Sequence, residues 1–348
     1  MKTEKQIVKP TRSRGEKVVT VIVGAFILAA IILIALDWKQ VRDVLSKSNL
    51  ELTLVALLFT VVSYFCLSFG YVIVNKVFSI KVRWQELFEV GLVSTALNNI
   101  LAFMGAAGHS LRVMLMRGHK VEPGGIMAAS VFHSYLNNII MFVFPVIGLI
   151  YVLLRHLVHG GTATTFAILA VILVFIIIIA TVIMLVPKIR SWVLHVVNSL
   201  WHLITRKDIT PFITDLDTAL NNGVTAMRKN RSATIILLVL MSAFWAFSAG
   251  ALWFCFSALG KAPDIGVLFC GFGIGIIAGN LSMIPGGLGV QEASLAGIFA
   301  LLGTSFTQAA LASILFRVVY DFIPFLLSLL LYRQLMRRKN SPSKKATV

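Results

Sequence analysis

The sequence predicts an all-α polytopic membrane protein, and three observations support this fold class. Apolar residues make up 58% of the 348 residues and charged residues only 13%, whereas a soluble domain carries about a quarter charged residues. Several uncharged runs are long enough to cross a hydrocarbon core, which takes roughly 20 helical residues. A glycine-rich segment late in the chain has a partial copy early in the chain, as in transporters built from two related halves.

Six segments are predicted to span the membrane completely. They are Val18–Leu36, Leu52–Asn75, Pro123–Leu154, Thr162–Val186, Ser232–Gly260 and the final helix Ser305–Leu331. Lysine and arginine are concentrated before the first segment and after the last, so the positive-inside rule places both termini in the cytoplasm. We therefore expect a basic cytoplasmic tail at residues 1–17, a single integral membrane domain at residues 18–335 and a second basic tail at residues 336–348.

The net charge of +17 reflects membrane topology rather than nucleic-acid binding, because the basic residues flank the spans. The same flanking residues attract anionic lipid headgroups. Cys66, Cys255 and Cys270 lie in apolar segments and show no CxxC spacing, so neither a disulfide framework nor a zinc site is expected. The sequence also lacks a P-loop and an HExxH motif. We expect no cofactor, no metal and no enzymatic activity.

Two broken segments, NLSMIPGGLGVQE and its weaker copy NILAFMGAAGHSLR, mark two related halves of the chain. The first matched positions lie 181 residues apart: Asn99, Gly105 and Gly108 against Asn280, Gly286 and Gly289. The next lie 184 residues apart: Phe132, His133 and Asn137 against Phe316, Arg317 and Asp321. These offsets predict repeat halves of about residues 52–155 and 232–333. Since the first half has polar residues where the second has charged ones, the halves are expected to be functionally unequal.

Each broken segment is predicted to form a re-entrant helical hairpin. Both flanks of Leu87–Met116 are basic, so both of its ends are expected on the cytoplasmic side. Counting the spans from the N-terminus places the start of Ile265–Leu302 outside. If this segment also returns to the side from which it enters, the final helix ends in the cytoplasm beside its basic tail, as the positive-inside rule requires. Two full spans in each copy would satisfy the charges equally well. The hairpin alternative gives an inverted repeat with about six full spans plus two hairpins, whose irregular backbone must be buried in protein or line a cavity.

Residues 187–231 are predicted to lie on the cytoplasmic surface between the two halves. This segment carries seven basic and three acidic side chains, with tryptophan, leucine and phenylalanine scattered among them. Such a composition is typical of one or two amphipathic helices that lie in the plane of the membrane interface.

The second broken segment, residues 280–292, has the composition of a ligand-binding turn. Pro285 lacks an N–H and interrupts a helix, while Gly286, Gly287 and Gly289 permit positive φ and the close approach of a ligand. A new helix is predicted to begin near Gly289 with its free N–H groups directed at the turn, and a helix start of this kind favours an anion. A tight packing turn without a ligand is the alternative.

Three charged residues lie in the otherwise apolar C-terminal part of the chain. Glu292 would cost roughly 2.5–3.5 kcal/mol at a helix centre in lipid, so it should face a polar cavity, bind a cation or proton, or pair with Arg317 or Arg112. Arg317 and Asp321 stand at positions i and i+4 of the final helix and are predicted to form a buried ion pair. Arg317 could also present its planar guanidinium to a lipid phosphate.

Arg112 and His109 follow the first glycine turn, three residues apart. Arg112 could extend to the cytoplasmic interface, or it could hold an anionic headgroup at the inner mouth of a cavity. His109 could titrate, although a single histidine is more often a hydrogen-bonded structural group.

The segments PGGLGVQE and LFRVVYDFIP resemble the integral membrane domain of the lysylphosphatidylglycerol synthases, which also occurs as stand-alone proteins. The resemblance covers about residues 20 to 335. In the synthases this domain is the flippase that moves aminoacylated phospholipid between leaflets. By position, it implies that Pro285–Gly289 and Glu292 form the family's second broken segment and that Arg317 lies on the helix that follows. Met104 and His109 stand where family members show proline and an acidic residue, whereas Arg112 is retained.

The resemblance and the broken repeats together predict a flippase-like lipid translocase of the bacterial inner membrane. We expect the soluble aminoacyltransferase domain of the full synthases to be absent, so that the chain carries lipid without synthesising it. A membrane-embedded transferase with His109 or His133 as the base, and a non-transporting accessory subunit of an envelope-lipid enzyme, are the alternatives. A membrane phospholipid or lipid-linked substrate is the expected partner, and a homo-oligomer or an envelope-lipid biosynthetic enzyme is left open. The candidate substrate-binding residues are Arg112, His109, Asn280, Pro285, Gly286, Gly287, Gly289, Glu292, Arg317 and Asp321.

Overall fold

The computed structural model describes residues 46–101, 106–116, 123–206, 209–260, 262–282 and 284–340, and the regular structure in these residues is entirely helical. The predicted first span, Val18–Leu36, and the tail at residues 1–17 lie outside the described residues. So do Met104 and Gly105 of the first glycine turn, and most of the C-terminal tail.

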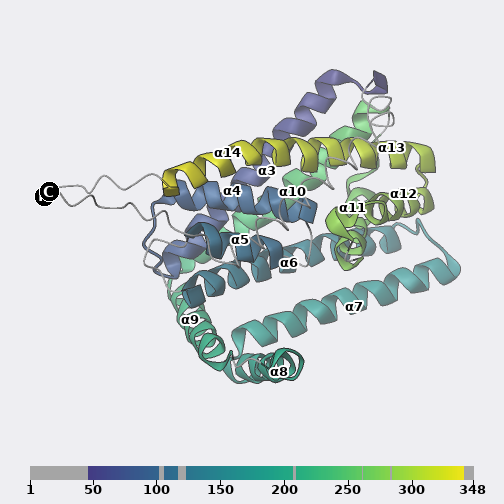
Figure 1. The fold of residues 1–348 in the computed structure, drawn as a ribbon. Helices are drawn as coiled ribbons and strands as arrows, with labels where there is room; N and C mark the ends of the chain where they lie inside the picture. The colour runs from purple at the N-terminus through teal and green to yellow at the C-terminus, as the bar shows by residue number, and fades with distance from the viewer. Residues whose placement is uncertain are drawn as a thin grey trace, which may run out of the picture. The chain divides into compact units, whose positions relative to one another are not determined.

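Five long apolar helical stretches in the described residues confirm five of the six predicted spans. They are α3 (Leu50–Val77), α6 (Pro123–Leu154), α7 (Gly160–Leu185), α10 (Arg231–Ala258) and the run α13 (Phe306–Arg317), η2 (Val318–Phe322) and α14 (Ile323–Asn340). In Figure 1 the last three continue one another as a single rod, drawn from green to yellow. The interruption at η2 is a π-helical turn. The chain is therefore a multi-pass membrane protein.

The matching helices of the two halves, α3 and α10, pack against each other in opposite directions. The backbone N–H of Asn49, just before α3, donates to the carbonyl of Ala258, the last residue of α10, at 2.9 Å. Further along, Gly250 lies against the ring of Phe59 and Gly70 lies against Met241. Small residues allow two membrane helices to approach closely. The two helices that the 181-residue offset pairs thus run antiparallel in space.

Each half contains a pair of short helices where the sequence predicts a broken hairpin. The first pair is α4 (Trp84–Leu101) and α5 (Ala106–Met116), with 18 and 11 residues. The second pair is α11 (Ile265–Leu281) and α12 (Val290–Leu301), with 17 and 12 residues, joined through the single turn η1 (Pro285–Gly287). Every one of these helices is shorter than the roughly 20 residues that cross a bilayer core. Their lengths favour hairpins that turn back within the membrane.

The two halves also contact each other through the second hairpin. Helix α11 packs closely on α6, because Gly148 has no side chain and the backbone at Cys270 occupies the space beside it. At the other end of the hairpin, η1 touches the C-terminal end of α4, where the carbonyl of Ile100 lies beside Gly286. The broken segments of the two halves therefore meet at one place.

Residues 187–231 form two helices, α8 (Pro187–Thr205) and α9 (Thr210–Lys229), as predicted. Helix α9 packs on α6 through apolar side chains at helical spacing, namely Ile213, Leu216, Leu220, Val224 and Met227. Helix α8 instead exposes apolar side chains, including Trp192 and Trp201. Arg190 joins the two helices through an ion pair with Asp217 at 2.6 Å.

Candidate functional site

A polar cavity of about 310 Å³ lies where the two broken hairpins meet. Its volume is at the lower end of the range for small-molecule pockets, about 300–1,000 Å³. Amide and hydroxyl side chains from both halves line it: Ser94, Thr95, Asn98, Asn99, Ser134, Asn137, Asn138, Asn280 and Gln291. Ionisable and aromatic side chains also line it: His109, Arg112, His133, Asp321, Phe142, Phe244, Trp245, Phe272 and Tyr320. Four further apolar side chains and three glycines complete the lining: Leu67, Met141, Ile276, Leu281, Gly108, Gly286 and Gly287. Polar side chains at this density inside apolar helices indicate a substrate pathway.

Arg112 is the buried cation of this cavity that makes no ion pair with any described residue. Its side chain is only 6% exposed, so it does not extend to the surface as one alternative expected. Its Nε donates to the Oγ of Ser94 at 2.9 Å, and its guanidinium lies 4.3 Å from the ring centroid of Tyr71. Its Nη1 has no hydrogen-bond partner among the described residues. A buried guanidinium with an unused donor is suited to an anion from outside the chain.

Two further polar atoms beside Arg112 also lack partners. The Oδ1 of Asn98 and the Nδ1 of His109 are buried without a hydrogen-bond partner among the described residues, and both residues line the cavity. Buried polar atoms are normally paired, so unpaired atoms gathered at one place are suited to hydrogen-bond a ligand. His133 differs, because its Nε2 lies 3.1 Å from the carbonyl oxygen of Leu67. The described residues contain no group of three or more His, Cys, Asp or Glu side chains that could hold a metal ion.

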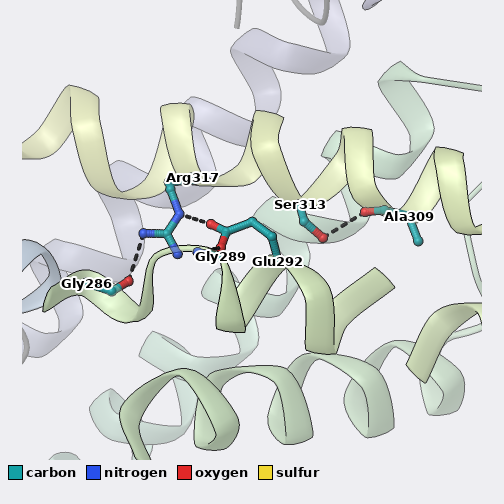
Figure 2. Close-up of polar contacts among 6 residues, drawn as sticks. All are labelled: Gly286, Gly289, Glu292, Ala309, Ser313 and Arg317. Carbon is teal, nitrogen blue, oxygen red and sulfur yellow. Dashed lines mark hydrogen bonds and ion pairs between the residues drawn. The ribbon is translucent and has the colours of Figure 1, made fainter. Parts of the chain in front are cut away.

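Behind the cavity, Arg317 fastens the second broken turn to the final long helix (Figure 2). Its Nη1 donates to the carbonyl of Gly286 at 2.8 Å, and its Nε forms an ion pair with the carboxylate of Glu292. The other carboxylate oxygen of Glu292 accepts from the N–H of Gly289 at 2.8 Å. We call Arg317, Glu292, Gly286 and Gly289 the clamp. Its Arg317 still has one donor, Nη2, without a partner among the described residues.

The clamp corrects two expectations from the sequence. The ion pair predicted between Arg317 and Asp321 is wrong, because the guanidinium turns to Glu292 and Gly286, which together offer it two acceptors. The helix predicted near Gly289 does begin there, with Gly289 as the N-cap of α12. However, the N–H of Gly289 is taken by the carboxylate of Glu292, so the anion at this helix start comes from the chain itself.

Two glycines make the second turn possible. Gly286 and Gly287 have φ of +64° and +61°, which a residue with a side chain rarely adopts. A Cβ on Gly287 would lie 2.9 Å from the Cα of Gly279, so the turn also folds tightly against α11. The backbone of the turn can therefore reach the end of α4 and the edge of the cavity only with glycine at these positions.

Asp321 lies in the π-helical turn and faces the cavity. It is 6% exposed, and the amide side chain of Asn99 lines the same cavity. The same amide donates to the hydroxyl of Tyr64 at 2.9 Å, which in turn donates to the backbone carbonyl of Tyr320 at 3.0 Å. The hydroxyl of Tyr320 is hydrogen-bonded to Ser248 at 2.6 Å. A polar network thus links the first hairpin to the final helix and to α3 and α10.

The structure divides the predicted site residues into two groups. Those that line the cavity are Arg112, His109, Asn280, Gly286, Gly287 and Asp321. Gly289, Glu292 and Arg317 belong to the clamp, and Pro285 begins the turn η1. The sequence reasoning missed Ser94, Asn98 and Tyr71, which surround Arg112. The paired amides Asn98-Asn99 and Asn137-Asn138 within apolar helices were the available signal, since polar residues at membrane depth usually face a pathway.

Comparison with known proteins identifies the family. Residues 21–328 match the family described as the lysylphosphatidylglycerol synthase TM region. The chain belongs to this family. The resemblance noted from the PGGLGVQE and LFRVVYDFIP segments is therefore confirmed, and the match includes both broken hairpins, the clamp and the cavity.

Within this family, curated relatives match different shares of the chain. A UPF0104 membrane protein from Methanothermobacter thermautotrophicus is 22% identical over 311 residues, which cover 86% of this chain and 90% of the relative. Another from the same organism is 29% identical over 110 residues, 32% of this chain and 31% of that protein. The phosphatidylglycerol lysyltransferase of Bacillus subtilis is 24% identical over 249 residues, 70% of this chain but only 25% of the enzyme. The chain therefore spans about a quarter of the length of this enzyme, whose name states an activity.

Proposed function

We propose that this member of the lysylphosphatidylglycerol synthase TM family is a translocase that moves a phosphate-bearing lipid between the two leaflets. The headgroup would enter the cavity between the hairpins while the acyl chains remain in the bilayer. The name of the Bacillus subtilis relative, a phosphatidylglycerol lysyltransferase, supports a phospholipid as the substrate. We assign this chain the role of carrier, without a chemical step.

The observation that carries this proposal is the unpaired Nη1 of Arg112 at the cavity wall. Leaving a guanidinium buried without an anion is unfavourable, and a phosphate oxygen is an acceptor that suits its planar geometry. The buried Oδ1 of Asn98 could accept from a hydroxyl of the same headgroup. The cavity therefore offers a cationic contact for phosphate with amide groups around it.

The arrangement of the two halves supports alternating access to this cavity. Helices α3 and α10 are paired by the 181-residue offset and antiparallel in space, as expected for an inverted repeat. We propose that the two halves rock against each other along this pair and expose the cavity to one leaflet and then to the other. In the orientation that we propose, both termini lie in the cytoplasm and the protein resides in the inner membrane.

A carrier is favoured over a transferase by the contact of His133, the second of the two candidate bases. Its Nε2 is engaged by the carbonyl oxygen of Leu67, and its ring packs edge-on against Tyr71. Both contacts give this histidine a structural role. No comparable observation supports an accessory role without transport.

The proposal can be tested with the purified protein in vesicles that contain fluorescent phosphatidylglycerol. Transfer of the probe between leaflets is measured by its accessibility to a membrane-impermeant reducing agent. We expect faster transfer than in protein-free vesicles. Arg112→Gln should slow transfer about tenfold or more, because a hydrogen bond to a charged group contributes about 1.5–3 kcal/mol. Arg112→Lys should retain an intermediate rate, since it keeps the charge and loses the planar fork.

Arg155→Gln is the matched control, because Arg155 also lies over a tyrosine ring, that of Tyr151, but is exposed outside the cavity. It should transfer the probe at the wild-type rate. A fluorescent glycolipid without phosphate provides the control for the substrate and should gain little from the protein. Transfer by wild-type protein no faster than in protein-free vesicles would contradict the proposed function. Wild-type transfer by Arg112→Gln would remove Arg112 from the headgroup site.

A further inference from the structure

Asp321 occupies an unusual position for a carboxylate. It lies in the π-helical turn of the final long helix, is 6% exposed, and faces the cavity. Single π-helical turns inside α-helices occur frequently at functional sites. Aspartate at membrane depth is rare, and it normally pairs with a cation or faces a pathway.

No cation among the described residues pairs with Asp321. Arg317 stands one turn earlier on the same helix, but its Nε is committed to Glu292 and its Nη1 to the carbonyl of Gly286. Within the described ranges, no lysine, arginine or histidine nitrogen lies within the 4.0 Å of an ion pair from Asp321. An ionised carboxylate that is buried without a counter-charge is costly, whereas the neutral acid costs much less. The side chain therefore has reason to exchange a proton with water in the cavity.

The groups that face Asp321 come from every element packed around it. On its own rod and on the second hairpin they are Arg317, Tyr320 and Glu292; on α4 and α3 they are Asn99 and Tyr64. The other ionisable groups that line the cavity are His109, Arg112 and His133. Because Arg317 and Glu292 neutralise each other, the charge that changes at this wall of the cavity is that of Asp321 itself.

Asp321 lies next to a hydrogen-bonded chain that leads to the first hairpin. The amide of Asn99, on α4, lines the same cavity and donates at 2.9 Å to the hydroxyl of Tyr64 on α3, which donates at 3.0 Å to the carbonyl of Tyr320, the neighbour of Asp321 in the chain. An ionised Asp321 only accepts hydrogen bonds, whereas a protonated one can also donate. Loss or gain of the proton therefore changes what Asp321 offers to this neighbouring chain and to a ligand in the cavity.

We propose that Asp321 is a proton-binding site and that its proton exchange with the cavity couples lipid transfer to the proton gradient. The carboxylate takes a proton from cavity water on one side and returns it to water on the other, with no other bond made or broken. The coupling rests on the proposed lipid transfer, but the proton site itself does not.

The proton site is tested directly by infrared difference spectroscopy of the reconstituted protein during a pH step. We expect a carbonyl stretch from a protonated carboxyl group that appears as the pH falls and is lost in Asp321→Asn. Asp264→Asn is the matched control, since Asp264 is exposed at the start of α11 and asparagine is an equally good N-cap. This variant should keep the band. Persistence of the same band in Asp321→Asn, or its absence from the wild type, would overturn the proton site.

Coupling is tested on the wild-type protein by imposing a pH difference across the vesicle membrane. With one proton for each lipid, a difference of one pH unit should shift the final distribution of the lipid probe about tenfold between leaflets. The shift should disappear with a protonophore and in Asp321→Asn, but remain in Asp264→Asn. If the probe moves yet ends evenly distributed, coupling is wrong and the carrier proposal survives. If the probe does not move while the Asp321 band titrates, the carrier proposal fails and the proton site survives.

Discussion

Glu292 neutralises Arg317 from 25 positions earlier in the sequence, and its second carboxylate oxygen caps the helix on which it stands. A single side chain therefore fixes both the charge of the final helix and the start of α12. The Gly286 carbonyl completes this arrangement by accepting from the same guanidinium. The broken turn at the cavity edge is thus held by contacts that lie behind it, which leaves its cavity face free.

The clamp predicts an asymmetric response to loss of its charges. Arg317→Met should destabilise the protein by about 3–5 kcal/mol, because it leaves the Glu292 carboxylate buried without a cation. The double variant Arg317→Met with Glu292→Gln should recover part of this loss, since glutamine removes the orphaned charge and still accepts from the Gly289 N–H. The apparent melting temperature in detergent provides the measurement.

Arg333→Met serves as the control for the clamp, because Arg333 is exposed on the same rod and its replacement should leave the melting temperature unchanged. A double variant that is less stable than Arg317→Met alone would show that charge compensation does not explain the clamp. Lipid transfer by a stable double variant would show that the free Nη2 of Arg317 is not needed for the headgroup.

Three glycines of the second hairpin should respond to alanine in a graded order. Gly287→Ala should be the most damaging, because it combines a φ of +61° with a Cβ only 2.9 Å from Gly279. Gly289→Ala should cost about 1–3 kcal/mol from backbone strain alone, since its φ is +79° and nothing lies within 4 Å. Gly297→Ala, with neither feature, should be neutral or stabilising by up to about 1 kcal/mol. Melting temperatures in any other order would contradict the geometry of the turn.

Gly148 should be intolerant of any side chain, because it forms the close contact between α6 and α11. A Cβ at this position would lie 2.1 Å from the backbone nitrogen of Cys270, and backbone cannot move aside as a side chain can. Gly148→Ala should therefore reduce the amount of monodisperse protein recovered by size-exclusion chromatography. Gly161→Ala, at the start of α7 with nothing within 4 Å, should be recovered like the wild type. Equal recovery of both variants would mean that α6 and α11 are not in close contact.

The cavity should contain water that is reachable from outside. In a variant with the three native cysteines replaced, Asn98→Cys and Asn280→Cys should react with a membrane-impermeant thiol reagent, because these positions of opposite halves line the cavity. Ala312→Cys should remain unmodified, since Ala312 is fully buried in α13. Labelling is measured by mass spectrometry of the intact protein. If neither cysteine reacted with the reagent, the cavity would be an apolar packing defect without water rather than a substrate site.

The features that could be predicted from the sequence are those encoded by local composition. Long apolar runs specify α3, α6, α7, α10 and the final rod. A chain segment in a bilayer must pair its own backbone N–H and C=O groups, and a helix does so within the segment. Pro285 and the glycines after it specify the second break for the same local reason. Asn280, a candidate site residue, lines the cavity, and so does Asn99, which the 181-residue offset pairs with it.

The sequence analysis offered two partners for Arg317, Glu292 and Asp321, and the structure confirms Glu292. Helical spacing alone could not decide between them, because Glu292 reaches the guanidinium from another helix, where the Gly286 carbonyl is a second acceptor. The π-helical turn at Asp321 has no recognised signal in a single sequence. Likewise, the pairing of Asn99 with Tyr64 joins two helices whose relative placement only the folded chain defines.

The contact surface between α3 and α10 is nearly symmetric. Two glycine contacts join these helices, Gly250 with Phe59 and Gly70 with Met241. Adding 181 to the number of Phe59 gives a position one residue from Met241, and adding it to Gly70 gives a position one residue from Gly250. The repeat offset therefore converts each contact approximately into the other. Two identical subunits related by a two-fold axis make the same kind of contact, in which one surface packs against its own copy in the opposite direction. Because both surfaces of this contact belong to one chain, the two halves need not be identical, and one carries Arg317 where the other has His133.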